Sequence, residues 1–419
     1  MIREAPPGCP VEADFDPLSP EYLAEPMRVL EALAVESRPL FYAPSLDHVV
    51  VLEHGLIDEV FRHPDVYSAA NTQLPLVPIV PEAQEILRAG GHRPQPSMVS
   101  LDPPDHARLR RPAARAFTPR RVDAMADTIR TTTHELLDGV EGHPRFDLVA
   151  TVAHPLPARV MFALIGLPSE HWAQLKRWCG YRAELSWGRP PPETQVDIAT
   201  NMAAYRGFLR DFVALRMDER ADDLTSDLCA IHDEAPDQLT GAEITSILFS
   251  LSFAGHETTT GLIGNAVRRL LEAPARWDAL VADPLRIGAA VDETLRYDTS
   301  VPVWRRVTTR ATTLGGIDLP AGTKLFLWLA ACNRDPTVFA DPDRFDLDRT
   351  DAHRALSFGK GAHYCLGAAL GRLEARLALE ELMSRRPRLR LVPDQRLRFH
   401  PNIAFRGPLE LLVEDAPPP

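Results

Sequence analysis

The longest stretch of apolar residues along the chain predicts a helix from Thr240 to about Glu272. Thr240 and Glu243 have the spacing of a capping box, in which each side chain binds a free backbone N–H at the start of a helix. Residues 244–253 are apolar on nearly every side, which is typical of a helix buried in the centre of a large protein. A second helical run is predicted over Ala368–Leu382.

Strand patterns are short, and helical patterns dominate the middle of the chain. The β-like run 48–52 is followed by a helical pattern over 55–63. Further strands are predicted at 315–320, 324–329 and 389–392. The Pro- and Gly-rich stretch 73–100 predicts an irregular loop, either a lid over a binding site or simple surface disorder. The whole pattern predicts one mainly α-helical domain that carries small β-sheets.

Composition and charge narrow the class of protein. The 419 residues are 45% hydrophobic and 25% charged, as in ordinary globular proteins. A formal charge of −12 disfavours nucleic acid as a partner. No apolar run approaches the roughly 20 residues needed to span a bilayer, and the first residues lack the apolar core of a secretory signal. We therefore expect a cytoplasmic protein with neither a membrane nor a nucleic acid as its partner.

The five cysteines are odd in number, widely spaced and free of any CxxC pair. This spacing argues against a disulfide framework and against a structural zinc site. The 39 prolines, together with Arg in place of most Lys, indicate a codon bias from which no function is inferred.

The middle of the long helix departs from its own pattern. Residues 254–259, Ala-Gly-His-Glu-Thr-Thr, place a glycine, an acid and two alcohols inside an apolar rod. A glycine there costs roughly 0.5–1 kcal/mol, and a buried ionisable group is costly unless it is paired. Such departures are expected at functional sites. The alternative is a solvated kink at which Thr258 bonds back to a carbonyl.

A glycine-rich loop leads from Phe358 into the second helix and carries Cys365 at the junction. Free N–H groups and the helix dipole at such a position lower the pKa of a thiol. Gly359 and Gly361 allow the backbone to wrap the sulfur, and Gly367 allows close approach of a flat macrocycle. A buried core cysteine or a protease nucleophile would explain an isolated cysteine, but neither explains the residues around this one.

Residues 358–367 resemble the haem-binding signature of the cytochromes P-450, Phe-Gly-x-Gly-x-His-x-Cys-x-Gly, at every fixed position. Residues 254–259 resemble that family's oxygen-binding segment, Ala-Gly-x-Asp/Glu-Thr-Thr. Glu293 and Arg296 match its Glu-x-x-Arg pair, and 102–111 resembles the propionate-binding helix of bacterial members. The motifs follow one another in the order of the family.

The resemblance runs from about Phe15 to Val413 and implies the cytochrome P-450 fold, mainly α with small β-sheets. It implies a single haem domain over 15–413, with an N-terminal extension at 1–14 and a Pro-rich tail or cut linker at 414–419.

The resemblance also implies haem b as the cofactor and a role for each matching residue. Cys365 is the implied iron ligand, and Thr258 and Glu257 are the implied catalytic residues, which supply protons during oxygen reduction. The other residues implied to bind the cofactor are His106, Arg110, Ala254, Gly255, Arg306, Phe358, Gly359, His363 and Gly367. Arg305 stays open as an alternative to Arg306, and each cation taken alone could be a solvated surface residue.

A structural network and a substrate pocket are implied in the same way. Arg344 is expected to complete a network with Glu293 and Arg296. The expected pocket walls are Leu251, Val301, Pro302, Val303 and Ile403, with the 73–100 stretch as the roof. Ordinary core packing is the alternative for each wall residue. Since these residues are apolar, an apolar or aromatic substrate is expected.

The implied activity is that of a haem-thiolate monooxygenase, which inserts one oxygen atom from O2 into a small molecule by hydroxylation or O-dealkylation. Electrons are expected from NAD(P)H through a ferredoxin or flavodoxin-like donor that docks on a basic patch of a monomer. The expected patch residues are Arg108, Arg111, Arg372 and Arg376. Residues 187–190 and 402–408 further resemble haem domains fused to their own flavin and iron–sulfur reductase. A peroxide-driven peroxygenase and a haem-based ligand sensor remain as alternatives.

Overall fold

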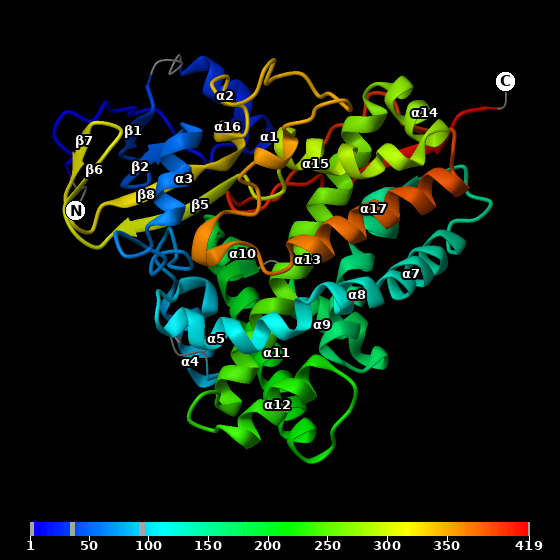
Figure 1. The fold of residues 1–419 in the computed structure, drawn as a ribbon, viewed down its shortest axis with the longest axis horizontal. Coiled ribbons are helices and arrows are strands. Elements are labelled where there is room, and N and C mark those ends of the chain that lie inside the picture. The colour runs from blue at the N-terminus through cyan, green and yellow to red at the C-terminus, as the bar shows by residue number, and fades with distance from the viewer. Residues whose placement is uncertain (1–3, 34–37, 92–96, 181, 418–419) are drawn as a thin grey trace.

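The computed structural model describes residues 4–33, 38–91, 97–180 and 182–417. Helices form most of the molecule, and the largest sheet lies at one side, near the N-terminus (Figure 1). The helices are α1 (Pro20–Ala24), α2 (Pro26–Ala32), α3 (His54–Arg62), α4 (Pro81–Ala89), α5 (Asp105–Ala114), α6 (Pro119–Ala124), α7 (Ala126–Asp138), α8 (Pro155–Ile165), α9 (Trp172–Cys179), α10 (Arg182–Trp187), α11 (Pro192–Asp218), α12 (Leu224–Glu234), α13 (Gly241–Leu271), α14 (Pro274–Ala282), α15 (Ile287–Tyr297), α16 (Leu329–Cys332) and α17 (Ala368–Arg385).

Three small sheets accompany the helices in the described part of the chain. The strands are β1 (Leu40–Ala43), β2 (His48–Val51), β3 (Tyr67–Ser68), β4 (Arg145–Asp147), β5 (Val303–Thr308), β6 (Thr312–Leu314), β7 (Ile317–Leu319), β8 (Lys324–Trp328), β9 (Leu389–Leu391) and β10 (Leu412–Asp415). The largest sheet has the order β1-β2-β8-β5-β3, in which β2 and β8 are parallel and the other neighbours are antiparallel. The other sheets have the orders β4-β10-β9 and β6-β7. The predicted fold class, mainly α with small sheets, is confirmed.

Helix α13 forms the centre of the helical part, where it packs against α8, α11, α15 and α17. The predicted capping box is present, because the Thr240 hydroxyl accepts from the Glu243 N–H at 3.2 Å and the Glu243 carboxylate accepts from the Thr240 N–H at 2.9 Å. The apolar residues that follow are buried in the main hydrophobic core. The sequence therefore predicted both the start and the burial of this helix.

Proline occupies the first position of seven helices among those described, namely α1, α2, α4, α6, α8, α11 and α14. The first residue of a helix has no partner for its N–H, so proline loses nothing there and its fixed φ suits the helix. We interpret the abundance of proline as codon bias. Some of these prolines also favour the start of a helix.

The 73–100 stretch, predicted to be an irregular loop, contains helix α4, so that part of the prediction is wrong. Pro81 is the first residue of the helix, and Ala83 lies on its buried side. Gly90 follows the helix where an added Cβ would lie 2.5 Å from the Ala203 side chain on α11, which shows how closely the two helices approach. Residues 92–96 of the predicted loop lie outside the described part of the chain.

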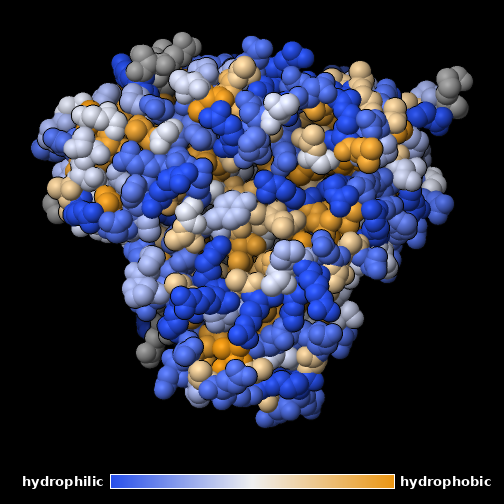
Figure 2. Space-filling view, viewed as in Figure 1, coloured by the Kyte–Doolittle hydropathy of each residue, from blue (hydrophilic) through white to orange (hydrophobic). Residues whose placement is uncertain are grey.

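The predicted domain boundaries at the two ends need correction. Cys9 is buried against the large sheet, and the Glu12 N–H donates to the Tyr42 carbonyl, so this part of the expected extension packs on the domain. Strand β10 continues to Asp415, which pairs with Leu389, so the expected tail begins later than 414. Hydrophilic residues cover most of the face in Figure 2, with smaller apolar areas between them. None of the described helices has the length and apolar character needed to cross a membrane.

Candidate functional site

A cavity of about 270 Å³ lies between α13 and the loop that precedes α17. Residues from the two motifs line it together, although about a hundred positions separate them in the sequence. The predicted site residues among those lining it are His106, Arg110, Leu251, Ala254, Gly255, Thr258, Val301, Arg306, Phe358, Gly359, His363, Cys365 and Gly367. The structure therefore brings together most of the residues that the sequence predicted to meet, but not Glu257, Pro302, Val303 or Ile403.

The loop that carries Cys365 is held by close backbone packing. The Cys365 N–H donates to the Phe358 carbonyl at 2.9 Å, which closes the loop on itself. Gly361 has φ +69°, and a Cβ there would lie 2.4 Å from the Phe61 carbonyl oxygen of α3. Only glycine tolerates this combination of left-handed backbone and close approach. The loop therefore presents the sulfur to the cavity in a fixed position.

Burial raises the pKa of the Cys365 thiol, although the Gly367 N–H and the guanidinium groups of Arg110 and Arg372 act to lower it. The sequence predicted a lowered pKa from the helix start alone, and this prediction is wrong for the thiol by itself. Desolvation in the cavity outweighs the nearby positive charge. A metal ion bound to the sulfur would deprotonate it despite this burial, because a coordinating thiol is deprotonated by the metal.

Four side chains that can carry positive charge meet at one side of the cavity. His106 and Arg110 lie one turn apart on α5, and the His106 and His363 ring centroids are 4.0 Å apart. Arg306 lies in the same group on β5, and burial lowers its pKa to about 10. Burial and these positive neighbours lower the pKa of His363 to about 3. Such a cluster is suited to bind carboxylate groups.

Arg305, the alternative to Arg306, points elsewhere. Its guanidinium donates to the Thr72 carbonyl at 2.7 Å and lies 3.9 Å from the centre of the Trp187 ring. Since alternate residues of a strand face opposite sides, Arg305 and Arg306 cannot both face the cavity. Arg306 is the one of the two that lines it.

Thr258 lies on the cavity wall with Ala254 and Gly255. Its hydroxyl donates to the Ala254 carbonyl at 2.7 Å, as the interpretation of a back-bonded threonine predicted. A hydroxyl that donates in this way keeps lone pairs with which it can accept a hydrogen bond from the cavity. The back-bond of that interpretation is therefore present, while α13 continues as one α-helix through residues 254–259.

Glu257 is buried on a different side of α13, within a group of basic residues. Its two carboxylate oxygens lie 3.6 Å from His256 Nδ1 and 3.8 Å from His400 Nε2. Burial raises the pKa of Glu257 to about 7, and Lys176 acts to lower it. A carboxyl with a pKa near neutral can both release and recover a proton, which general acid catalysis requires.

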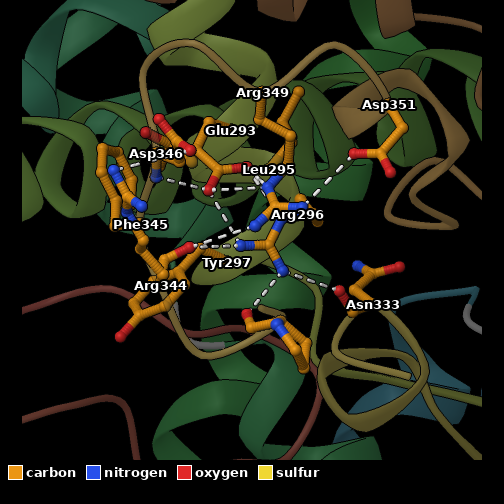
Figure 3. Close-up of polar contacts among 12 residues, drawn as sticks. Glu293, Leu295, Arg296, Tyr297, Asn333, Arg344, Phe345, Asp346, Arg349 and Asp351 are labelled. Atoms are coloured by element: carbon orange, nitrogen blue, oxygen red, sulfur yellow. Dashed lines mark hydrogen bonds and ion pairs between the residues drawn. The ribbon is translucent and has the colours of Figure 1, made fainter. Parts of the chain in front are cut away.

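Glu293 and Arg296 form a fully buried ion pair, with 1% and 0% of their side chains exposed. Two hydrogen bonds of 2.7 and 2.8 Å join the guanidinium to the carboxylate. Arg344 does not complete this network as predicted, because it offers only its main-chain carbonyl while 69% of its side chain is exposed. The third charged side chain is Arg349, 3.2 Å from Glu293 (Figure 3). The sequence prediction placed the second arginine five residues too early.

Three of the five predicted wall residues are misplaced. Pro302, Val303 and Ile403 are absent from the described lining of the cavity, and Val303 and Ile403 are buried in the core beside the large sheet. Their chain neighbours line the cavity in their place: Val301 and Trp304, Ala404 and Phe405. The error is a shift of one residue, which turns a side chain to the other face of an extended chain. Gln73, Met98 and Val99 from the predicted roof also line the cavity.

The sequence prediction missed the aromatic walls and one acid. Trp187 and Trp304 lie with ring centroids 5.6 Å apart, and Phe253 and Phe405 lie 5.5 Å apart. Glu374 on α17 also lines the cavity, is buried, and has one carboxylate oxygen without a hydrogen-bond partner. Burial raises the pKa of Glu374 well above its usual value. An acid on the apolar face of a helix was the signal that could have identified it.

The residues of the cavity fit a haem. A thiol stands on one wall, and four potentially cationic side chains stand at one edge. The Nε2 atoms of His106 and His363 are buried and have no hydrogen-bond partner among the described residues. Buried polar atoms without partners are uncommon in proteins, and a bound group is one explanation for them. Two propionate groups would supply the missing acceptors and neutralise the positive charge.

Comparisons with known proteins give the family of the chain. The family model "Cytochrome P450", here written P-450, matches residues 287–397. The erythromycin C-12 hydroxylase of Saccharopolyspora erythraea is 38% identical over 83% of this chain and 86% of its own length. A solved type IV self-sufficient cytochrome P-450 monooxygenase has a TM-score of 0.94 and 33% identity over 99% of this chain. This chain spans only 55% of that longer one.

A further solved structure is cytochrome P-450 CREJ in complex with (4-ethylphenyl) dihydrogen phosphate. It has a TM-score of 0.91 and 34% identity, and covers 95% of this chain and 99% of its own. The fold and the cavity thus define a haem-thiolate oxidoreductase, a monooxygenase. The chain belongs to the cytochrome P-450 family.

Proposed function

We propose that this chain binds haem b with Cys365 as the iron ligand and oxidises an apolar or aromatic small molecule by hydroxylation or O-dealkylation. The observation that carries the proposal is the meeting of Cys365, Thr258 and aromatic side chains around one cavity. His106, Arg110, Arg306 and His363 would hold the propionates. When bound, a thiolate-ligated haem supplies the activation of O2, since the sulfur donates electron density that favours O–O cleavage.

The residues of α13 hold and move protons in this proposal. The Thr258 hydroxyl faces the cavity, and Glu257 on the next position is buried with a pKa of about 7. Glu257 can therefore take up a proton from Lys176, whose pKa burial lowers to about 7, and release it toward the cavity. Thr258 would pass that proton on through its hydroxyl, which can donate and accept at once. Glu257 and Thr258 are thus proposed as the catalytic residues.

The side chains of the walls favour an aromatic substrate. Trp187, Trp304, Phe253 and Phe405 offer ring faces and edges, and aromatic pairs gain about 0.5–1.5 kcal/mol beyond the burial of their area. The aromatic ring in the ligand of the CREJ structure supports the same class of substrate for this chain. The experiment that tests the class is a titration of the purified haem protein with alkylphenols and with aliphatic compounds of equal size. Aromatic compounds are expected to change the iron spin state at lower concentration, and equal affinities would contradict this choice.

The electron donor proposed is a ferredoxin, a flavodoxin-like protein or a fused flavin and iron–sulfur reductase that takes electrons from NAD(P)H. The longer self-sufficient structure supports the fused arrangement. The basic patch predicted for docking is partly neutralised, because Arg108, Arg372 and Arg376 pair with Glu243, Asp292 and Glu380. We therefore expect only a modest contribution of this patch to docking. The monomeric state and the cytoplasmic location remain predictions from the sequence.

Replacing Thr258 with Ala is expected to divert electrons from product into hydrogen peroxide. Because positioned proton transfer contributes roughly 10²–10⁴-fold to a rate, we expect product formed per NAD(P)H to fall roughly tenfold or more. The measurement compares NAD(P)H consumed, product formed and peroxide released. Thr245→Ala is the matched control, since Thr245 makes the same back-bond in α13, to the Gly241 carbonyl at 3.0 Å, but does not line the cavity. Unchanged coupling in Thr258→Ala would remove Thr258 from the mechanism.

Replacing Arg306 with Gln is expected to weaken haem retention more than replacing Arg305. A hydrogen bond to a charged group contributes about 1.5–3 kcal/mol, so haem should dissociate roughly 10–100-fold faster from Arg306→Gln. Arg305→Gln removes a contact to Thr72 and Trp187 and should act mainly on stability. The measurement is the rate of haem transfer to an acceptor protein. Equal rates in the two variants would contradict the assignment of Arg306.

A further inference from the structure

A group of side chains that could hold a metal ion lies on and beside α13, outside the described lining of the cavity. His154, His256 and Glu257 each offer one donor atom, and these three atoms lie within 4.8 Å of one another. His256 and Glu257 are buried in α13, and His154 directly precedes α8, which packs against α13. Two packed helices therefore bring the three donors close together.

The spacing of the donors is close to that of a tetrahedral site. With Zn–N and Zn–O bonds of about 2.0–2.1 Å, neighbouring donors around a zinc ion lie about 3.4 Å apart. His256 Nδ1 and Glu257 Oε1 are already 3.6 Å apart. The largest separation in the group, up to 4.8 Å, would have to close by about 1.4 Å, which rotation of the half-buried His154 ring can provide.

Further donors stand beside these three. Cys179 Sγ lies 3.8 Å from His256 Nδ1, and His400 Nε2 lies 3.8 Å from Glu257 Oε2. His256 is fully buried, and its Nε2 has no hydrogen-bond partner among the described residues. Imidazole, carboxylate and thiol together form the donor set that zinc prefers, whereas Mg²⁺ and Ca²⁺ prefer oxygen.

We propose that His154, His256 and Glu257 form a binding site for a divalent transition metal, Zn²⁺ foremost, and that the bound ion inhibits turnover by taking Glu257 out of proton delivery. The inhibition rests on the role proposed above for Glu257, whereas the binding of the ion does not. One neighbour opposes the ion: Lys176 Nζ donates to the His154 carbonyl at 2.6 Å, so its ammonium group lies close by. This positive charge sets the affinity of the site and gives a means to test it.

Equilibrium dialysis of the holoprotein against Zn²⁺, with metal analysis, tests the binding. The wild-type protein is expected to bind one zinc ion. The variant His154→Gln should bind zinc at least about tenfold more weakly than the wild type, since even second-shell changes at zinc sites cost 10–100-fold. Lys176→Met should bind zinc more tightly, because it removes a like charge. His143→Gln, which changes an exposed histidine after α7, is the matched control and should bind as the wild type does. Equal zinc binding by wild type and His154→Gln, or none by either, would overturn the site.

Turnover with and without Zn²⁺ tests the inhibition in the same proteins and with the same electron donor. Zinc should slow product formation by the wild type, a chelator should restore it, and His154→Gln should resist zinc. The carbon monoxide spectrum and the substrate-induced spin change should stay unaltered, because the ion does not enter the cavity. Zinc that binds without slowing turnover would overturn the inhibition and with it the role of Glu257, while the metal site would stand.

Discussion

Cys365→Ser is expected to abolish the strongly red-shifted Soret band that the reduced protein shows with carbon monoxide, and with it NAD(P)H-driven product formation. Serine has the size of cysteine and leaves the loop geometry intact, including the 2.9 Å hydrogen bond from residue 365 to Phe358. It removes only the sulfur, whose electron donation to the iron favours O–O cleavage. The measurement is the difference spectrum of the reduced protein with and without carbon monoxide.

Cys229→Ser is the matched control for this variant. Cys229 is also a free cysteine, and it is fully buried on α12 in the main hydrophobic core. It should cost some stability and leave the band in place. If Cys365→Ser kept the red-shifted band, the ligand would be another residue and the proposed function would fail.

Arg296→Met is expected to destabilise the protein by about 3–5 kcal/mol, a large part of the net stability of an ordinary protein. The change leaves the Glu293 carboxylate buried with only Arg349 as its charged partner, 3.2 Å away. It also removes donors to the carbonyl groups of Asn333, Pro342 and Arg344, which tie the chain after α16 to α15. Urea unfolding followed by circular dichroism gives the free energy of unfolding.

Two controls separate the buried pair from ion pairs in general. Arg88→Met breaks the pair of Arg88 with Glu85, whose side chains are 66% and 62% exposed, and should cost less than about 1 kcal/mol. The double variant of Glu293→Leu and Arg296→Leu should cost less than the two single changes added together, because neither charge of the pair is left buried without the other and Arg349 keeps Asp351 as a partner. Additive costs would show that the pair does not act as a unit.

Much of the fold could be predicted because local patterns determine it. The capping box at Thr240 marks the start of α13, and the loop at Cys365 marks the start of α17, so both helices follow from residues close in sequence. Strands β2 and β8 are also recognisable from short apolar runs. Their pairing with each other is parallel and spans most of the chain, and no local pattern indicates it.

The errors at the site come from geometry that a motif does not contain. Val303 and Ile403 were expected at the cavity, but an extended chain turns alternate side chains away, so Trp304 and Ala404 face it. The network required a guanidinium near Glu293. Arg349 supplies it, and the Arg344 carbonyl, which accepts from Arg296, holds the intervening chain beside the pair. The pKa of Cys365 depends on burial among residues from several helices, which a helix start alone does not reveal.

The prolines that begin seven of the described helices also act on the state in which no helix exists. In the denatured ensemble a proline has fewer backbone conformations than other residues, so the chain loses less entropy when it folds. A compatible proline contributes roughly 0.4–1 kcal/mol by this route. Over seven positions the sum is several kcal/mol, the size of the whole net stability of many domains, about 5–15 kcal/mol. A compositional tendency that carries no catalytic information can thus raise heat resistance without altering one contact of the native enzyme.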